Sequence, residues 1–351
     1  MRGAQDGTVR AAQVFLFVME NLIYVDDNLP GITRRGAGTG FAFYSPDGEL
    51  IRDRAERNRL NSVALPPAYR DAWFCPASNG HILATGYDDA GRKQYRYHPD
   101  FRRMREAEKF DRLLLFGKRL PLLRKRVAHD MATGSIGRDR VIASIVRLLD
   151  LAALRIGNES YTRRNDSHGA TTLRDGHASL TGETLQLSFT GKSGKNRCVT
   201  IEDGALARSV RDMREVPDEH LFAYHDADGE AAPVISGDVN EYLRDAMGSA
   251  FSAKDFRTWH ASRLALEFLI DTHDTATMTA VTEYVARELG NTPAVTRSSY
   301  IHPAVIELVD RQEEWRESLQ MLRATRWHQA SERALLHLLQ ETPKSAALLA
   351  A

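Results

Sequence analysis

Five polar side chains in the second half of the chain are of types that could act together on a phosphate ester. Arginine donates forked hydrogen bonds to phosphate oxygens, lysine can deliver a proton, and a tyrosine hydroxyl can form a covalent ester. The five residues are Arg155, Lys192, Arg257, Asn291 and Tyr300. Arg257 is the most suggestive of them, because an arginine that opens an apolar helix is unfavourable unless an anion lies nearby.

Each of these residues also has an ordinary structural interpretation. Arg155 ends an apolar helix, where a cation complements the helix dipole, and Lys192 stands at a hairpin tip, where a lysine stays in water. Asn291 follows a Leu-Gly helix stop and could be a cap, whereas Tyr300 could be a half-buried core residue. The functional interpretation therefore depends on the five residues occurring together.

The elements that carry these residues can be predicted from the pattern of apolar positions. Apolar residues recur with helical spacing over 142–149, and this helix is expected to run on to about Leu154. Helices are expected again from about Ala205 to the end of the chain. Between them, the turn at 191–196 predicts a hairpin with Lys192 at its tip. Strand-like runs occur at 171–173, 178–180, 185–189 and 197–201.

The first hundred residues have a different composition. Short strand-like runs cut by Pro, Gly and Asp turns fill residues 21–98, among them 80–86 and 92–97, and helical periodicity begins near Pro99. The sequence therefore predicts an α+β protein. We expect a small β-rich N-terminal domain at 19–98 and a mostly helical C-terminal domain at 99–351 that contains one small three-stranded sheet.

Two features bear on the compartment in which the protein works. Residues 1–18 are expected to be a dispensable leader, with Met19 as an alternative start, because their apolar run is too short to cross a bilayer and no small-residue cleavage site follows. Cys75 and Cys198 are the two cysteines, which excludes a disulfide scaffold and a cysteine-rich metal site. Both features favour a cytoplasmic protein.

The charge of the chain is balanced overall but uneven along its length. The 351 residues carry 47 Lys and Arg against 47 Asp and Glu, which excludes a uniformly basic coat for nucleic acid. Residues 91–130 nevertheless hold a clear excess of basic side chains, and Tyr95 and Tyr97 lie close to Arg92 and Lys93 within that segment. Because bases offer π-faces and phosphates attract cations, this mixture suits nucleic acid as well as a solvated helix face.

The order of the five polar residues resembles that of the type IB DNA topoisomerases, in particular the compact poxvirus-like and bacterial members. The similarity extends over about residues 20–340. In the N-terminal part it rests on phrases at 24–27, 30–34, 64–69, 84–86 and 91–98. In the C-terminal part it rests on Arg-Ile-Gly at 155–157, Phe-Thr-Gly-Lys at 189–192, Lys-Asp-Phe-Arg-Thr at 254–258, Leu-Gly-Asn-Thr-Pro at 289–293 and Ser-Ser-Tyr at 298–300.

The resemblance implies the catalytic fold shared by these topoisomerases and the tyrosine recombinases, and a role for each residue. Tyr300 would attack a phosphodiester and form a 3′-phosphotyrosyl ester, which stores the bond energy so that supercoils relax without ATP. Arg155 and Arg257 would clamp the non-bridging oxygens, with Asn291 as a neutral donor, and Lys192 would protonate the departing 5′ oxygen. No metal or cofactor is implied, since arginines do here what Mg²⁺ does elsewhere.

One residue departs from the pattern of many family members, which carry His where Asn291 stands. Both side chains can donate a hydrogen bond, but asparagine does not titrate. A general acid or base role at this position is therefore excluded in this chain.

The resemblance also implies double-stranded DNA as the partner. The β-rich domain and the helical domain would close on the duplex as a clamp that opens at a linker near residues 98–104. No membrane and no obligate protein partner are expected, and the enzyme would act as a monomer in the cytoplasm, at the bacterial nucleoid. The residues expected to contact DNA are Arg92, Lys93, Gln94, Tyr95, Tyr97 and Tyr161.

Two other functions remain open from the sequence. Tyrosine site-specific recombinases share the catalytic residues, but they usually carry His-x-x-Arg at the second arginine, where this chain has Lys254 three positions before Arg257. Their N-terminal domain is usually a helical bundle. A non-catalytic DNA-binding protein with a decayed site is the second alternative, against which stand workable side chains at all five positions.

Overall fold

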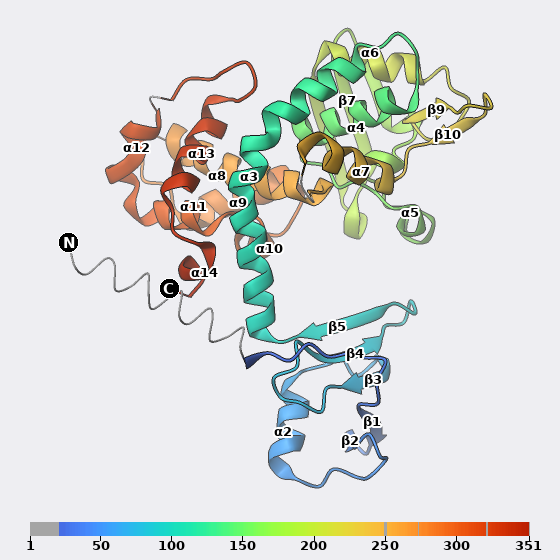
Figure 1. The fold of residues 1–351 in the computed structure, drawn as a ribbon, viewed down its shortest axis with the longest axis vertical. Coiled ribbons are helices and arrows are strands. Elements are labelled where there is room, and N and C mark those ends of the chain that lie inside the picture. The colour runs from blue at the N-terminus through green and yellow to red at the C-terminus, as the bar shows by residue number, and fades with distance from the viewer. Residues whose placement is uncertain (1–20, 249–250, 273, 321, 351) are drawn as a thin grey trace. The chain divides into compact units, whose positions relative to one another are not determined.

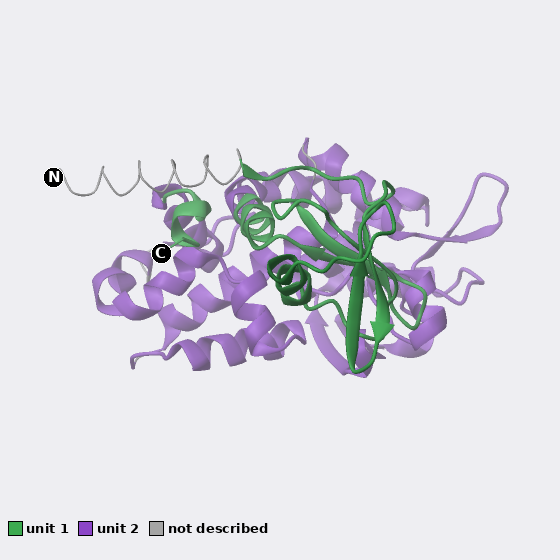
Figure 2. Cartoon of the chain, turned by 90° about the horizontal axis from the view of Figure 1, so that it is seen from below, with its two compact units in different colours: residues 1–109, 343–351 green, residues 110–342 purple. Residues whose placement is uncertain are grey.

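The computed structural model describes residues 21–248, 251–272, 274–320 and 322–350, and the chain divides into two compact units. Figure 2 colours unit 1, residues 1–109 with 343–351, and unit 2, residues 110–342. The division falls within helix α3 (Pro99–Met131), so the expected linker at 98–104 coincides with the start of a continuous helix. The expectations for residues 1–18 and Met19 lie outside the described residues.

Unit 1 is built on a five-stranded antiparallel sheet in the order β2-β1-β3-β4-β5 (Figure 1). A small core forms where Phe43 and Phe74 meet edge to face and Leu60 of the helix packs with them. The strands predicted at 80–86 and 92–97 are confirmed as β4 and β5. The elements are β1 (Ile32–Ala37), β2 (Gly40–Tyr44), α2 (Arg54–Ser62), β3 (Arg70–Phe74), β4 (Ile82–Tyr87) and β5 (Lys93–Tyr97).

Unit 2 is mostly helical and confirms the predicted α+β class. Its elements up to the small sheets are α4 (Arg138–Ala152), α5 (Glu159–Asn165), η1 (Ala170–Thr172), η2 (Asp175–His177), β6 (Ala178–Thr181), β7 (Thr184–Thr190), η3 (Lys192–Gly194), β8 (Asn196–Glu202), α6 (Gly204–Met213), β9 (Ala223–His225) and β10 (Ala231–Pro233). The remaining helices are α7 (Ser236–Met247), α8 (Ala253–Asp271), α9 (Met278–Leu289), α10 (Pro293–Ser299), α11 (Pro303–Leu308), η4 (Val309–Arg311), α12 (Gln312–Gln320) and α13 (Ala330–Glu341), while α14 (Ser345–Leu348) belongs to unit 1.

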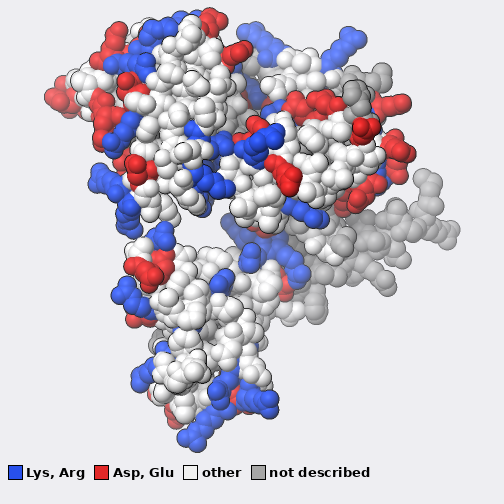
Figure 3. Space-filling model, turned by 180° about the vertical axis from the view of Figure 1, so that it is seen from behind, with Lys and Arg blue, Asp and Glu red and all other residues white. Residues whose placement is uncertain are grey.

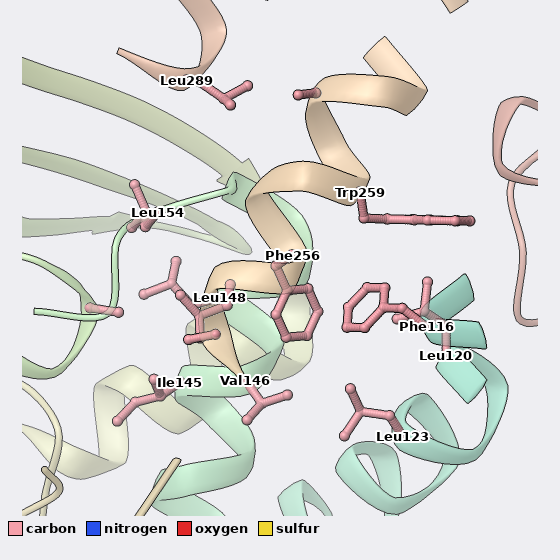
Figure 4. Close-up of a cluster of buried hydrophobic side chains, with 14 of the residues drawn as sticks. Phe116, Leu120, Leu123, Ile145, Val146, Leu148, Leu154, Phe256, Trp259 and Leu289 are labelled. Atoms are coloured by element: carbon pink, nitrogen blue, oxygen red, sulfur yellow. The ribbon is translucent and has the colours of Figure 1, made fainter. Parts of the chain in front are cut away.

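The core of unit 2 lies where α3, α4 and α8 face one another. Figure 4 shows Phe116 of α3 against Phe256 and Trp259 of α8, with Leu148 of α4 beside them. All four side chains are buried, and each aromatic ring removes roughly 150–250 Å² from water. This packing fixes α4, which ends shortly before Arg155, and α8, which contains Arg257.

The predicted three-stranded sheet is present, in the antiparallel order β6-β7-β8. The strands expected at 178–180, 185–189 and 197–201 are confirmed, and a tight turn joins the last two. The strand expected at 171–173 is wrong, because those residues form the 3₁₀ turn η1. Its backbone N–H groups bond to the loop that follows α4, donating from Ala170 to Arg155 O and from Thr171 to Ile156 O, and so cannot join a sheet.

The expectation of helices alone beyond Ala205 is also incomplete. A short hairpin, β9–β10, interrupts them. The acidic loop at its tip is closed by Asp226, whose Oδ1 accepts hydrogen bonds from the backbone N–H groups of Asp228 and Glu230. Gly229 supplies the positive φ of 81° that the turn requires.

The surface carries charges of both signs. Lys and Arg side chains are interspersed with Asp and Glu on the face drawn in Figure 3, as the equal totals of the two kinds imply. In the described part of the chain, no helix combines the length and the apolar character that crossing a membrane requires.

Candidate active site

The loop that carries Arg155 is tightly braced. Helix α4 ends at Ala153 in a left-handed conformation, and the buried Leu154 anchors the next position. Gly157 adopts a φ of +99°, and a Cβ on the neighbouring Gly169 would lie 2.5 Å from its backbone nitrogen. Only glycine fits there, so the loop and the η1 turn are pressed together. The backbone that carries Arg155 is therefore held in place by its close packing against the η1 turn.

The β7–β8 turn carries Lys192 at an exposed position. The N–H of Gly191 donates to Lys195 O at 2.8 Å and closes the turn, while Ser193 and Gly194 adopt positive φ values of 65° and 70°. This geometry confirms the predicted hairpin. The ammonium group of Lys195 lies 3.5 Å from the carbonyl oxygen of Asn291, so the turn faces the end of α9.

Arg257 lies in the second turn of α8, which begins at Ala253, so the interpretation that it opens the helix is wrong. Its side chain is only 4% exposed. It donates to Ala153 O at 2.5 Å, to Leu289 O at 3.0 Å and to the side-chain oxygen of Asn291 at 3.0 Å. Carbonyls, rather than a helix N-terminus, thus surround the buried guanidinium, whose Nε–H has no partner among the described residues.

Asn291 bridges the two arginines. Its Oδ1 also accepts a hydrogen bond from Arg155 at 2.7 Å, while its backbone N–H donates to Ala286 O and ends α9. Because both arginines only donate, the amide oxygen must face them. The amide nitrogen is buried and has no partner within the described part of the structure, which leaves it as a donor for another group.

Tyr300 follows α10 as its C-cap and is half-buried. Its backbone N–H donates to Thr296 O at 3.0 Å, and the guanidinium carbon of Arg257 lies 5.3 Å from the centre of its ring. Burial raises the pKa of the Tyr300 hydroxyl, but the charges of Arg257 and Arg155, and hydrogen bonds from both, outweigh burial and lower the pKa below its usual value.

The site concentrates positive charge. Burial, with the nearby charge of Arg155, lowers the pKa of Arg257 to about 10, so the guanidinium is still protonated at neutral pH. Lys192, Lys195 and Arg197 line a small pocket with these two arginines. Such a cluster favours an anion, and a phosphate placed between the arginines would meet the phenol of Tyr300. The structure thus brings together the predicted Arg155, Lys192, Arg257, Asn291 and Tyr300.

Sequence reasoning missed Arg197 and His168, which also line the pocket. His168 is buried, and its Nδ1 lies 2.6 Å from Thr172 O. Arg197 donates to the end of α9 from β8. A basic residue close behind the hairpin lysines was the available signal for Arg197, but its partner lies about 90 residues further along the chain, so no local pattern could reveal the contact.

The residues expected to contact DNA lie in two places. In unit 1, the rings of Tyr95 and Tyr97 are exposed and stack in parallel with centroids 5.7 Å apart. The polar residues near them are already paired: Arg92 and Gln94 with Asp88, and Lys93 with Asp27. In unit 2, Tyr161 is exposed on α5.

No group of three or more His, Cys, Asp or Glu that could hold a metal ion occurs among the residues that the structure describes. The expectation that the reaction needs no metal or cofactor stays a prediction.

Comparisons with known proteins bear on both units. A family model described as the catalytic core of eukaryotic DNA topoisomerase I matches residues 98–325, and one described as the N-terminal domain of bacterial DNA topoisomerase IB matches residues 40–88. DNA topoisomerase 1B of Acanthamoeba polyphaga mimivirus is 30% identical over 301 residues, which cover 82% of this chain and 90% of that protein. DNA topoisomerase 1 of Mycosarcoma maydis is 28% identical over 195 residues, or 48% of this chain and 19% of that protein.

Among solved structures, two complexes of the XerH site-specific recombinase with difH substrates show a slight likeness. The post-cleavage complex has a TM-score of 0.38 at 16% identity and covers 55% of this chain and 51% of that chain. The pre-cleavage complex has a TM-score of 0.36 at 17% identity and covers 65% of this chain and 59% of that chain. The family models and the mimivirus relative decide the assignment: this chain belongs to the type IB DNA topoisomerases and is an isomerase that acts on DNA.

Proposed function

We propose that this topoisomerase relaxes supercoiled duplex DNA through a 3′-phosphotyrosyl intermediate at Tyr300, as a monomer and without ATP or a metal ion. The observation that carries the proposal is the position of Tyr300 beside two arginines that share one asparagine. Both arginines lower the pKa of the phenol that would attack.

In the cleavage step, Tyr300 Oη attacks the phosphorus atom and the bond from phosphorus to the 5′ oxygen breaks. The phenolic proton is lost to water, and the new phosphotyrosyl ester is close in energy to the bond it replaces. After the broken strand has rotated, the 5′ hydroxyl attacks the ester and reverses the step. Because the bond energy is stored in the ester, neither direction requires ATP.

The arginines stabilise the transition state. Arg155 and Arg257 donate to the non-bridging oxygens, where negative charge concentrates. The amide nitrogen of Asn291, which has no partner among the described residues, adds a neutral donor. Since Asn291 already holds the two guanidinium groups, little reorganisation is needed when the phosphate arrives. This is the charge stabilisation that a divalent metal supplies in other phosphoryl-transfer enzymes.

Lys192 is the proposed general acid. It is exposed at the hairpin tip, so it can approach the 5′ oxygen, and its ammonium group can release a proton more readily than a guanidinium can. Lys195 is the alternative acid on the same turn.

Duplex DNA would contact both the β-rich N-terminal domain expected at 19–98 and the helical domain expected at 99–351. Exposed Tyr95, Tyr97 and Tyr161 can touch bases or sugar–phosphate, while Arg92, Lys93 and Gln94 would have to exchange their carboxylate partners for DNA. We place the enzyme in the bacterial cytoplasm at the nucleoid. The family assignment argues against both the recombinase and the non-catalytic alternatives.

Plasmid relaxation in EDTA without ATP tests the proposal. We expect relaxation of positive and of negative supercoils, with Tyr300→Phe inactive as the control. Added Mg²⁺ should only speed turnover, by weakening DNA binding and hastening release. A strict requirement for Mg²⁺ or for ATP would contradict the proposal.

A further inference from the structure

Two arginines complete the hydrogen bonding at the C-terminal end of α9, the helix that leads into Asn291. A helix leaves its last four carbonyls without partners inside the helix. Arg257 donates to Leu289 O at 3.0 Å. Arg197 donates to Arg287 O at 3.3 Å and to Glu288 O at 2.8 Å. One of the two is a proposed catalytic residue, and the other belongs to the strand that leaves the Lys192 hairpin.

Arg197 fills the space between this hairpin and α9. A Cβ on Gly290 would lie 2.6 Å from its Nη1, and the φ of +65° at Gly290 independently favours glycine. At the other end of the side chain, a Cβ on Gly191 would lie 3.1 Å from its Cγ. The arginine is therefore packed against glycines on both sides, one beside Lys192 and one beside Asn291.

The guanidinium of Arg197 uses both of its terminal nitrogens to donate to these carbonyls. Burial and the charge of Arg155 lower the pKa of Arg197, while Glu288 opposes both. Cations near a helix C-terminus are favourable, because the helix dipole is negative there. Within the described residues, the further link between hairpin and helix is the weaker contact of Lys195 with Asn291 O at 3.5 Å.

We propose that Arg197 is a positioning residue that fixes the hairpin of the general acid against the Asn291 turn, and so sets the approach of Lys192 to the scissile phosphate. This inference rests on the proposed role of Lys192. Without the tether, an exposed turn with two left-handed residues would sample many orientations, and fewer of them would place the ammonium near the 5′ oxygen.

A DNA substrate with a 5′-bridging phosphorothiolate at the scissile position separates this role from a merely structural one, because a thiolate leaves without needing a proton. Single-turnover cleavage of ordinary and sulfur-substituted DNA is compared in the wild type, Lys192→Ala, Arg197→Ala and Arg197→Lys. Arg211→Ala is the matched control, since Arg211 donates to Gly182 O at 3.1 Å at the opposite end of the same sheet.

On ordinary DNA, the cleavage rate of Lys192→Ala should fall by the factor of roughly 10²–10⁴ that a general acid supplies. The cleavage rate of Arg197→Ala should fall about 10–100-fold, as expected when the Lys192 ammonium is misplaced. Arg197→Lys should lose less, because it keeps a cation at the helix end. The sulfur substrate should restore most of each loss. The double variant Lys192→Ala/Arg197→Ala should cleave no more slowly than Lys192→Ala, because one residue acts through the other.

The outcomes distinguish the two claims. One outcome keeps the general acid but overturns the positioning role. In it, the sulfur substrate restores the cleavage rate of Lys192→Ala, whereas Arg197→Ala and Arg197→Lys are slowed equally on both substrates. If Lys192→Ala is not rescued, the acid assignment fails and takes the inference with it. Should Arg197→Ala fold poorly, as judged by its thermal unfolding against Arg211→Ala, the comparison rests on Arg197→Lys, where a defect without rescue again overturns the inference.

Discussion

Asn291 Oδ1 accepts a hydrogen bond from Arg155 Nη2 at 2.7 Å, which joins two residues that stand 136 positions apart in the chain. Arg257 donates to the same oxygen at 3.0 Å. A neutral acceptor thus holds two cations side by side without cancelling their charge. A carboxylate in the same place would hold them as firmly but would occupy the positive field that a phosphate needs.

We therefore expect Asn291→Asp to cleave DNA more slowly than Asn291→Ala. The alanine variant loses one donor and the bridge, which should cost about 1–3 kcal/mol of transition-state stabilisation, or roughly 5–150-fold in cleavage rate. The aspartate variant keeps the bridge but repels the phosphate, and its pKa would be depressed by both arginines, so acid conditions near pH 5 should not restore activity. Single-turnover cleavage measures both. Cleavage by Asn291→Asp at or above the alanine rate would show that neutrality at this position is unimportant.

The hydroxyl of Tyr300 should titrate below the usual tyrosine value in the free enzyme. Burial raises its pKa, but the charges of Arg257 and Arg155 and their hydrogen bonds lower the pKa by more than burial raises it. Removing one charge with Arg257→Gln should move the pKa upward. Carbon-13 NMR of ring-labelled tyrosine follows the titration, with Tyr300→Phe identifying the resonance. An unchanged midpoint in Arg257→Gln would mean that the arginine does not act on the phenol.

Acid stability should depend on Glu332 of α13. Burial raises its pKa, but hydrogen bonds and charge from Arg124 outweigh burial and hold the pKa at about 2, against 4.5 for an ordinary Glu. A depressed carboxyl pKa adds stability above the unfolded value that is lost as pH falls from about 4.5 towards 2. The shift corresponds to about 3 kcal/mol.

Denaturant unfolding at pH 7 and pH 3 measures this contribution. Glu332→Gln should be less stable than the wild type at pH 7, and the difference should shrink at pH 3. Glu314→Gln is the control, because Glu314 pairs with Arg311 on the surface, where both side chains are more than half exposed. A Glu332→Gln defect that stays constant with pH would refute the role of its ionisation.

Aromatic and basic residues of β5 should affect DNA binding differently. Tyr95→Ala should weaken non-covalent binding by about 1–3 kcal/mol if a base stacks on the ring, without changing the dependence on salt. Lys93→Ala should lower the slope of affinity against salt by about one. Fluorescence anisotropy of duplex DNA at several salt concentrations distinguishes them. If both variants change the slope equally, stacking on Tyr95 is not part of the interface.

Local patterns were sufficient for the parts of this site that local chemistry determines. The hairpin that carries Lys192 was predictable, because turn residues separate two strand-like runs, and the helix before Arg155 was predictable from its apolar spacing. The strand expected at 171–173 was wrong, because these residues belong to the 3₁₀ turn η1: Thr171 N–H donates to Ile156 O in the Arg155 loop, and Thr172 N–H donates to Gly169 O within the turn. A hydrogen bond to a segment some 15 residues away does not change the local pattern of apolar residues, so the sequence pattern could not reveal it.

The assembly of the site was beyond local patterns. That Asn291 joins two arginines, and that Arg197 reaches α9, depends on how distant elements pack. The interpretation that Arg257 opens a helix is wrong, because Arg257 lies in the second turn of α8 and donates to the carbonyl oxygens of Ala153 and Leu289. The roles proposed for Arg155, Arg257 and Asn291 come from the family resemblance, which gave neither their geometry nor any role for Arg197.

Trapping the covalent intermediate tests the central claim most directly. A duplex labelled at the 5′ end of the scissile strand is incubated with enzyme, denatured and digested, and the labelled peptide is identified by mass spectrometry. The proposal predicts protein joined to the 3′ phosphate of the labelled fragment, through Tyr300, and no adduct with Tyr300→Phe although that variant still binds DNA. An adduct at the 5′ end, at another residue, or with the Phe variant would contradict the proposal.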